Sequence, residues 1–317
     1  MSLHHSGRLH ASPLKTRHLL LLVQLYECRS VLRAAEAANM TQPAASKLLA
    51  EMEHLLGVPL FERHARGVEP TRYGEVLARR ARSALSELGR ARDEITSLRD
   101  GRLGQAAIGT VVNPGTNLVP MAIAAVKQAA PDILIRVEMD ASRPLVARLL
   151  DGQLDIVIGR IMDPELGADL EFEALADEPH AVIARAGHPL ARTKVEYTEL
   201  AGYGWVMPPE SSVLRARLGA AFLDHGMPWP TNVVETAALP VITALLRGSD
   251  FLTALPARSV SPYIASGQLA VLPIQLGVRM EEFGIIRRRH QPLSPAAEQV
   301  LTALRNLARE LYPEPAD

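Results

Sequence analysis

Apolar residues recur at helical spacing in three successive stretches between residues 13 and 57. The first stretch predicts a bracing helix over 13–28. Asn39 and Met40 interrupt the second and third, and asparagine tolerates the left-handed backbone of a tight turn. We therefore expect two helices joined by a turn within residues 30–57, the second with a buried stripe of Leu48, Leu49, Met52, Leu55 and Leu56.

The start of the third helix leaves one face to short polar side chains. Thr41 stands where an N-cap belongs, and Pro43 falls in the first turn, where a missing N–H costs nothing. Glutamine and serine can read base edges in the DNA major groove, lysine can hold phosphate, and alanine or proline can contact a thymine methyl group. Periodicity alone also allows an ordinary helical hairpin inside a core. The candidate face consists of Gln42, Ala45, Ser46 and Lys47.

A basic hairpin follows this helix. Gly57 ends the helix, Arg63 and Arg66 precede Gly67, and residues 69–71 lead into another helix. A basic, glycine-containing hairpin directly after a recognition helix is suited to gripping the phosphate backbone. This order favours DNA binding over a buried hairpin.

Residues 33–75, RAAEAANMTQPAASKLLAEMEHLLGVPLFERHARGVEPTRYGE, closely resemble the winged helix-turn-helix of LysR-type transcriptional regulators. The alanine pair before the turn, TQPAAS at the start of the third helix, and the EMEHLLGVPLFER run carry the resemblance. It implies a DNA-binding domain over 13–71. The residues that it places against DNA are Arg33, Thr41, Gln42, Pro43, Ala45, Ser46, Lys47, Arg63, Arg66 and Thr71.

Residues 72–101 read as one long helix with an apolar seam. Seam positions alternate four and three residues apart, as in a coiled coil, and a single exposed helix cannot bury them. The resemblance implies a linker helix that dimerises the protein, while packing onto the chain's own C-terminal domain is the alternative. The seam consists of Leu77, Ala81, Ala84, Leu88, Ala91, Ile95 and Leu98.

Strand and helix patterns alternate from residue 103 onward, which predicts an α/β domain with a parallel sheet. The order resembles the effector-binding domain of the same family, a two-lobed α/β fold like that of periplasmic solute-binding proteins. The predicted domain covers 103–312, with lobe one over 103–178 and 271–312 and lobe two over 179–270.

Polar residues at strand ends and helix N-termini are the candidate effector contacts that the family resemblance implies. Free N–H groups and the positive dipole end of a helix bind carboxylates or hydroxyls, and Arg160 adds a charge suited to a carboxylate. For the serine and threonine hydroxyls, the alternative is plain helix capping. For Arg160, the alternative is a surface salt bridge to Asp163 or Glu165. We predict a small organic acid or sugar bound by Asn113, Thr116, Ser142, Arg160, Ser211 and Ser212.

Charge and cysteine usage add two points. The chain has 34 Lys+Arg and 35 Asp+Glu, yet residues 1–72 carry nine basic and six acidic side chains, so the positive end is the winged-helix end. Cys28 is the only cysteine, which suits a reducing cytosol; we interpret it as a small buried residue rather than a redox group. No signal peptide or membrane-length apolar run is present, so we expect a cytoplasmic protein.

Catalytic motifs are missing from the sequence: we find no G-x-S-x-G, H-E-x-x-H or phosphate-binding glycine loop. An enzyme using Ser211 or Ser212 as nucleophile has no activating histidine placed by motif, and a DNA-packaging protein has no use for a large acidic domain. We expect no enzyme activity, no cofactor and no metal. The expected partners are double-stranded DNA with an interrupted inverted repeat, a second copy in a dimer or tetramer, an effector from sugar or aromatic-acid catabolism, and RNA polymerase.

Overall fold

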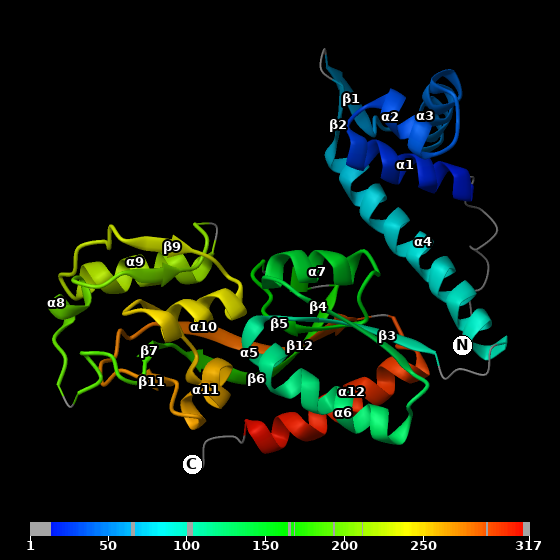
Figure 1. The fold of residues 1–317 in the computed structure, drawn as a ribbon. Coiled ribbons are helices and arrows are strands. Elements are labelled where there is room, and N and C mark those ends of the chain that lie inside the picture. The colour runs from blue at the N-terminus through cyan, green and yellow to red at the C-terminus, as the bar shows by residue number, and fades with distance from the viewer. Residues whose placement is uncertain are drawn as a thin grey trace, which may run out of the picture. The chain divides into compact units, whose positions relative to one another are not determined.

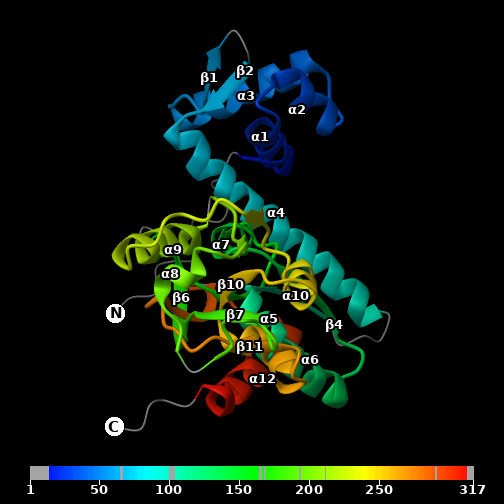
Figure 2. The ribbon, with the colours of Figure 1, turned by 60° about the vertical axis from the view of Figure 1, so that its left-hand side comes forward.

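The computed structural model describes residues 14–64, 67–99, 104–163, 166–167, 169–192, 194–210, 212–289 and 291–312. The chain forms two compact units, one of residues 1–105 with 147–155 and the other of residues 106–146 with 156–317. Figures 1 and 2 show the elements of both units. No helix in these ranges is long and apolar enough to cross a membrane.

Three helices, a two-stranded wing and a long helix make up the first unit. The turn between the second and third helices places Asn39 at φ 54°, as its residue type predicts. One core holds the unit together, with Leu22, Leu49 and Met52 buried between the helices. The elements are α1 (Thr16–Cys28), α2 (Val31–Ala37), α3 (Gln42–Leu56), β1 (Phe61–His64), β2 (Gly67–Pro70) and α4 (Arg72–Arg99).

The wing is fixed to α3 by one carboxylate. Glu53 Oε1 accepts hydrogen bonds from the backbone N–H groups of Leu60 at 2.8 Å and Phe61 at 3.2 Å. On the other side, Val68 N–H donates to the carbonyl of Arg29 at 3.0 Å. A Cβ on Gly67 would lie 2.3 Å from that carbonyl oxygen, so only glycine allows this approach. Recognition helix and wing are therefore one rigid piece.

The two halves of α4 differ in burial. Ala78 and Ala81 belong to the winged-helix core, and Leu77 packs against it. Leu88 and Ile95 are 59% and 67% exposed. Ala81 was expected in an intermolecular seam, and that prediction is wrong, because the residue is buried in the core of its own chain. Leu77 is partly buried against the same core, so its place in the seam stays a prediction. Ala84 and Ala91 are exposed as the seam requires, and the Leu98 side chain lies outside the described residues.

The second unit contains two five-stranded sheets among the described residues. In the first sheet, of order β4-β3-β5-β12-β6, β3 runs parallel to β5, while β12 runs antiparallel to both β5 and β6. Helices α6 and α12 supply Leu118, Ala122, Val300 and Leu304 to its core. Its elements are β3 (Gln105–Thr110), α5 (Val112–Thr116), α6 (Leu118–Ala129), β4 (Leu134–Met139), α7 (Ser142–Leu150), β5 (Ile156–Gly159), β6 (Leu170–Pro179), β12 (Arg279–Arg288) and α12 (Pro295–Leu311).

The second sheet has the order β11-β7-β10-β8-β9. One side packs against Leu218 and Phe222 of α9, and the other against Ile242 and Leu246 of α10. The chain passes between the sheets after β6 and again between β11 and β12. The elements are β7 (Ala181–Arg185), α8 (Tyr197–Leu200), β8 (Trp205–Met207), α9 (Val213–Asp224), β9 (Val233–Glu235), α10 (Leu239–Gly248), β10 (Leu252–Leu255), η2 (Ala257–Val260), α11 (Ser261–Ala265) and β11 (Leu269–Val271).

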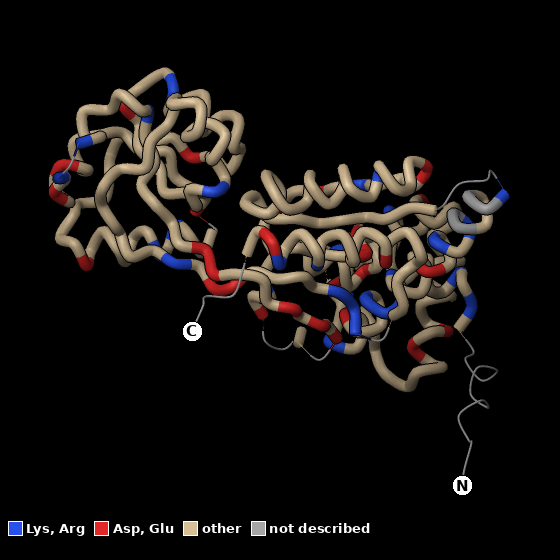
Figure 3. Tube along the Cα trace, turned by 90° about the horizontal axis from the view of Figure 1, so that it is seen from below, with Lys and Arg blue, Asp and Glu red and all other residues tan. Residues whose placement is uncertain are grey.

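The two-lobed α/β class is confirmed, but the parallel sheet is wrong. Both sheets are mixed, since β12 and β6 in the first and β7 and β11 in the second run antiparallel to their neighbours. The sequence reading also missed β6, an edge strand with half of its side chains in solvent and no sustained apolar run. Both signs of charge occur on the second unit, as Figure 3 shows.

Candidate DNA-binding and effector-binding sites

The N-terminal end of α3 presents an exposed polar face. Gln42, Pro43 and Lys47 are exposed, and Ser46 is half-buried. Ala45 is fully buried in the winged-helix core, so its assignment to the DNA face is wrong. Ala45 lies four residues before Leu49, on the face of α3 that packs inward. This helical spacing places Ala45 in the core and could have been recognised from the sequence. Ala44 is the exposed alanine that the sequence reading overlooked.

Three other predicted DNA contacts are exposed or half-buried at the edges of this face. Thr41 precedes α3 with extended backbone, but its side chain makes no capping hydrogen bond, contrary to expectation. The Thr71 hydroxyl donates to the carbonyl of Pro59 at 2.7 Å and accepts from Gly74 N–H at 3.2 Å, so it serves the fold. Arg33 is exposed while its Nη2 donates to the carbonyl of Cys28 at 2.6 Å.

On the wing, Arg63 is exposed on β1 and His64 lies 3.9 Å from Glu62 and 3.8 Å from Glu69. Arg66 lies outside the described residues. Cys28 is half-buried against the core of the first unit, as a small packing residue would be. The exposed side of α3 and the wing are thus geometrically suited to a groove and its phosphates.

The predicted effector residues of the first sheet meet where α7 begins. The buried Ser142 hydroxyl accepts a hydrogen bond from Arg160 N–H at 3.0 Å. A Cβ on Gly159 would lie 3.1 Å from Ser142 Oγ, so the glycine lets helix and strand approach. Within the short helix α5, the Thr116 hydroxyl donates to the carbonyl of Asn113 at 2.8 Å, and Asn113 is buried. Ser142 and Arg160 are therefore neighbours, although eighteen positions separate them.

Arg160 is not a free cation. Its Nη2 lies 2.6 Å from Glu178 Oε2, its Nε donates to the carbonyl of Glu281 at 2.7 Å, and both charged side chains are 7% exposed. Its guanidinium also lies 5.9 Å from the ring centre of Phe283. Glu178 balances the charge, so Arg160 does not supply the additional positive charge that was expected to suit a carboxylate. Arg160 is buried, so the alternative of a surface salt bridge to Asp163 is wrong, and Glu165 lies outside the described residues.

Two histidines of the second unit have pKa values below the ordinary value. Burial lowers the pKa of His180, whose Nδ1 lies 3.0 Å from the Glu178 carbonyl oxygen; the nearby Glu178 carboxylate opposes the shift. Burial also lowers the pKa of His188, whose Nδ1 accepts from Leu190 N–H at 3.0 Å. His188 is thus a hydrogen-bonded loop histidine.

At the start of α9, Ser212 is the N-cap residue by position, yet its side chain makes no capping hydrogen bond. The simple capping alternative therefore fails for Ser212. Ser211 lies outside the described residues. Within the described ranges, no group of three histidine, cysteine, aspartate or glutamate side chains is placed to hold a metal ion.

Comparison with known proteins agrees with this geometry. Residues 16–75 match the bacterial regulatory helix-turn-helix family of LysR type, and residues 99–309 match the LysR substrate binding domain. The chain is 37% identical over 294 residues to the HTH-type transcriptional regulator GbpR of Azospirillum brasilense, covering 92% of this chain and 86% of that protein.

Two solved structures share the fold. Full-length LysG from Corynebacterium glutamicum with bound effector Arg has a TM-score of 0.62 at 18% identity, covering 94% of this chain and 99% of that one. Full-length CbnR in complex with its target DNA has a TM-score of 0.58 at 20% identity, covering 92% and 99%. From its two family domains and its relative, this chain belongs to the LysR family of transcriptional regulators.

Proposed function

We propose that this regulator reads an interrupted inverted repeat in double-stranded DNA as a symmetric dimer. The exposed N-terminal face of α3, held rigidly to the wing by Glu53, is the observation that carries the proposal. Gln42 and Ser46 discriminate bases, while Lys47, Arg63 and Arg66 contact phosphates. Two-fold symmetry of the protein demands a matching symmetry in the site. The target DNA in the CbnR structure supports this use of the fold.

The exposed half of α4 supplies the dimer contact in this proposal. Leu88 and Ile95 lie in solvent in the single chain, and the alternating small residues Ala84 and Ala91 allow a close approach by another helix. Two such dimers associate into a tetramer in this proposal, as is common among LysR-type regulators. We place the protein in the cytoplasm, because a chain that binds operator DNA works beside the chromosome, where RNA polymerase is available as a partner.

A small organic acid or sugar is the proposed effector. The effector bound in the LysG structure supports a small-molecule ligand for this regulator as well. Ser142, Thr116 and Ser212 offer hydroxyl groups at helix starts, and the balanced Arg160–Glu178 pair receives hydroxyls as readily as carboxylates. We propose no cofactor and no metal beyond this ligand.

Titrations with specific and random duplexes test the DNA-binding proposal. Gln42→Ala should weaken the specific site by roughly 1–3 kcal/mol and leave random DNA unchanged. Arg63→Ala should weaken both duplexes together and lower the salt slope by about one. Arg247→Ala, which removes an exposed charge from α10, serves as the control. Equal losses of Gln42→Ala on both duplexes would show that Gln42 does not read bases.

Thermal shifts with a panel of organic acids and sugars test the effector proposal. A panel member that stabilises wild type should lose its shift with Ser142→Ala or Ser212→Ala, while operator binding in a gel-shift assay persists. Ser266→Ala, at an exposed serine after α11, should keep the full shift. A shift preserved in both serine variants would rule out these hydroxyls, and turnover of the stabilising compound would favour the enzyme alternative.

A further inference from the structure

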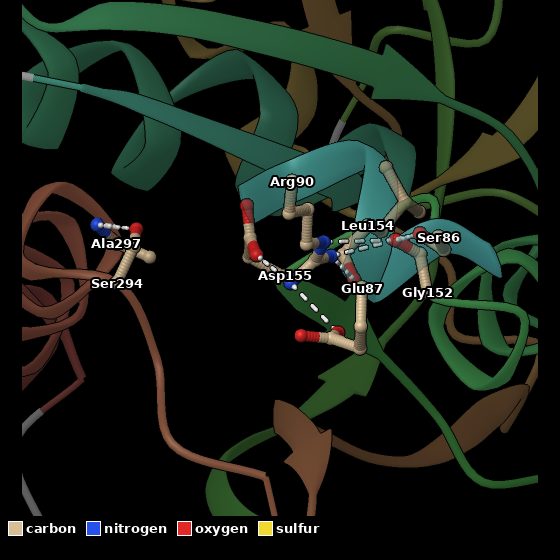
Figure 4. Close-up of polar contacts among 8 residues, drawn as sticks. All are labelled: Ser86, Glu87, Arg90, Gly152, Leu154, Asp155, Ser294 and Ala297. Atoms are coloured by element: carbon tan, nitrogen blue, oxygen red, sulfur yellow. Dashed lines mark hydrogen bonds and ion pairs between the residues drawn. The ribbon is translucent and has the colours of Figure 1, made fainter. Parts of the chain in front are cut away.

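The second half of α4 holds the loop that joins α7 to β5. Arg90 donates from Nε and Nη2 to the carbonyl of Gly152 at 3.1 and 2.7 Å, and from Nη2 to the carbonyl of Leu154 at 3.0 Å. Its Nη1 lies 2.6 Å from Asp155 Oδ1, and Ser86 Oγ donates to Gly152 at 2.5 Å (Figure 4). We name these five residues the α4 clasp.

The clasped loop is built for this contact. Gly152 has φ 79°, a left-handed conformation in which an L side chain is strained. The Asp155 side chain is 8% exposed, and all three nitrogens of the Arg90 guanidinium have partners. A planar fork of donors satisfied by two carbonyls and a carboxylate fixes orientation as well as distance.

The loop follows the C-terminal end of α7. At the other end, Ser142 at the start of α7 accepts a hydrogen bond from Arg160 N–H, directly after β5. Helix α7 has nine residues, so it is about 13 Å long. Helix α7 therefore connects the Ser142–Arg160 contact at its start to the loop at its end that α4 holds.

A second contact continues from the loop to the winged helix. Arg82 Nη1 lies 3.6 Å from Asp151 Oδ1, and its Nε lies 3.5 Å from Glu27 Oε1 of α1. The same guanidinium lies 4.5 Å from the ring centre of Tyr26. Residues 151–155 therefore contact α4 at two positions, Arg90 and Arg82. Arg82 also contacts α1.

We propose that the α4 clasp couples effector binding at the start of α7 to the DNA-binding helices. The inference rests on the proposed function, because it assigns the path between its two sites. An effector that displaces Ser142 relative to β5 moves residues 151–155 and strains the Arg90 contacts. Coupling between two binding sites is reciprocal, so operator binding must in turn alter the stability of α7 and β5.

Hydrogen exchange of the full-length protein tests this path without a known effector. The probe is a duplex enriched from a random pool by the wild-type protein. In wild type, we expect the duplex to change amide exchange in residues 142–159 by about threefold or more. Arg90→Gln should lose this change while keeping the duplex-induced protection of α3. Arg247→Gln, which removes an equal charge from the exposed end of α10, should behave as wild type.

A milder pair of variants covers the case in which Arg90→Gln fails to fold. Ser86→Ala removes one bond of the clasp and should reduce the change in residues 142–159. Thr96→Val removes a hydroxyl that donates to the Arg92 carbonyl of its own helix at 2.8 Å, and it should leave the change intact. An unchanged response in Arg90→Gln or Ser86→Ala, or no response in wild type, overturns the coupling. Failure of wild type to enrich any duplex overturns the proposed function and this inference with it.

Discussion

The two halves of α4 carry one apolar repeat but make different contacts. In the first half, Ala78 and Ala81 are buried against the chain's own winged helix. In the second half, Leu88 and Ile95 stand in solvent. The core that α1 shares with α4 covers the first half, whereas the described chain leaves the long apolar side chains of the second half largely exposed. A regular heptad pattern therefore does not by itself identify a dimer interface, and burial in the single chain separates the two uses.

Ala81→Glu should have the largest effect. The side chain is 2% exposed, so the glutamate adds both volume and an unpaired charge to a packed core. We expect the first unit to lose at least about 3 kcal/mol and operator binding to disappear. Thermal unfolding monitored by circular dichroism measures the loss. An unchanged melting temperature would mean that α4 does not pack on α1 in solution.

Leu88→Glu should affect assembly instead of folding. In a dimer seam the substitution places carboxylates in an apolar contact, so dimerisation should weaken about tenfold or more and operator affinity should fall with it. The leucine is 59% exposed in the single chain, so monomer stability should change by less than about 0.5 kcal/mol. Analytical ultracentrifugation gives the dimer constant, with Thr96→Glu as an exposed control. Wild-type sedimentation of Leu88→Glu would remove position 88 from the seam.

Asp151→Asn should give the smallest effect of the three substitutions. Asp151 contacts Arg82, near the junction of the two halves of α4. Burial raises the pKa of Asp151, and the Arg82 charge partly opposes this. A carboxyl with a raised folded pKa stabilises the fold below its unfolded pKa and loses that contribution as pH rises through the folded value. The asparagine variant should therefore gain stability relative to wild type as the pH rises above the unfolded aspartate pKa of about 4, because the wild-type carboxyl must then ionise while buried. Urea titrations at several pH values would show a flat difference if Asp151 were not buried.

Local patterns explain why the first unit was predictable. The turn at Asn39, the end of α3 at Gly57 and the basic wing all depend on residues close together in the chain. The error at Ala45 was one of helical phase, which the position of Leu49 could have corrected. Burial of Leu77 and Ala81 could not be read from the repeat, because it depends on how α1 crosses α4.

Distant pairings explain why the effector residues were only partly predictable. Ser142 and Arg160 were chosen separately, and the structure joins them. Glu178 comes from an edge strand that has no apolar alternation, and Glu281 lies 121 positions beyond Arg160. Nothing near Arg160 in the sequence shows that its charge is already balanced. The type of each residue was therefore readable, but its electrostatic state was not.

Glu53 has a consequence for the operator itself. By accepting from two consecutive N–H groups at the base of the wing, it removes the freedom of the wing to adjust its reach relative to α3. The distance between the α3 contacts in the groove and the wing contacts on the DNA backbone is then fixed by the protein. The duplex must deform to match this distance. Sequence preference should accordingly extend to base pairs that no side chain touches, with flexible pyrimidine–purine steps favoured between the α3 contacts and the wing contacts.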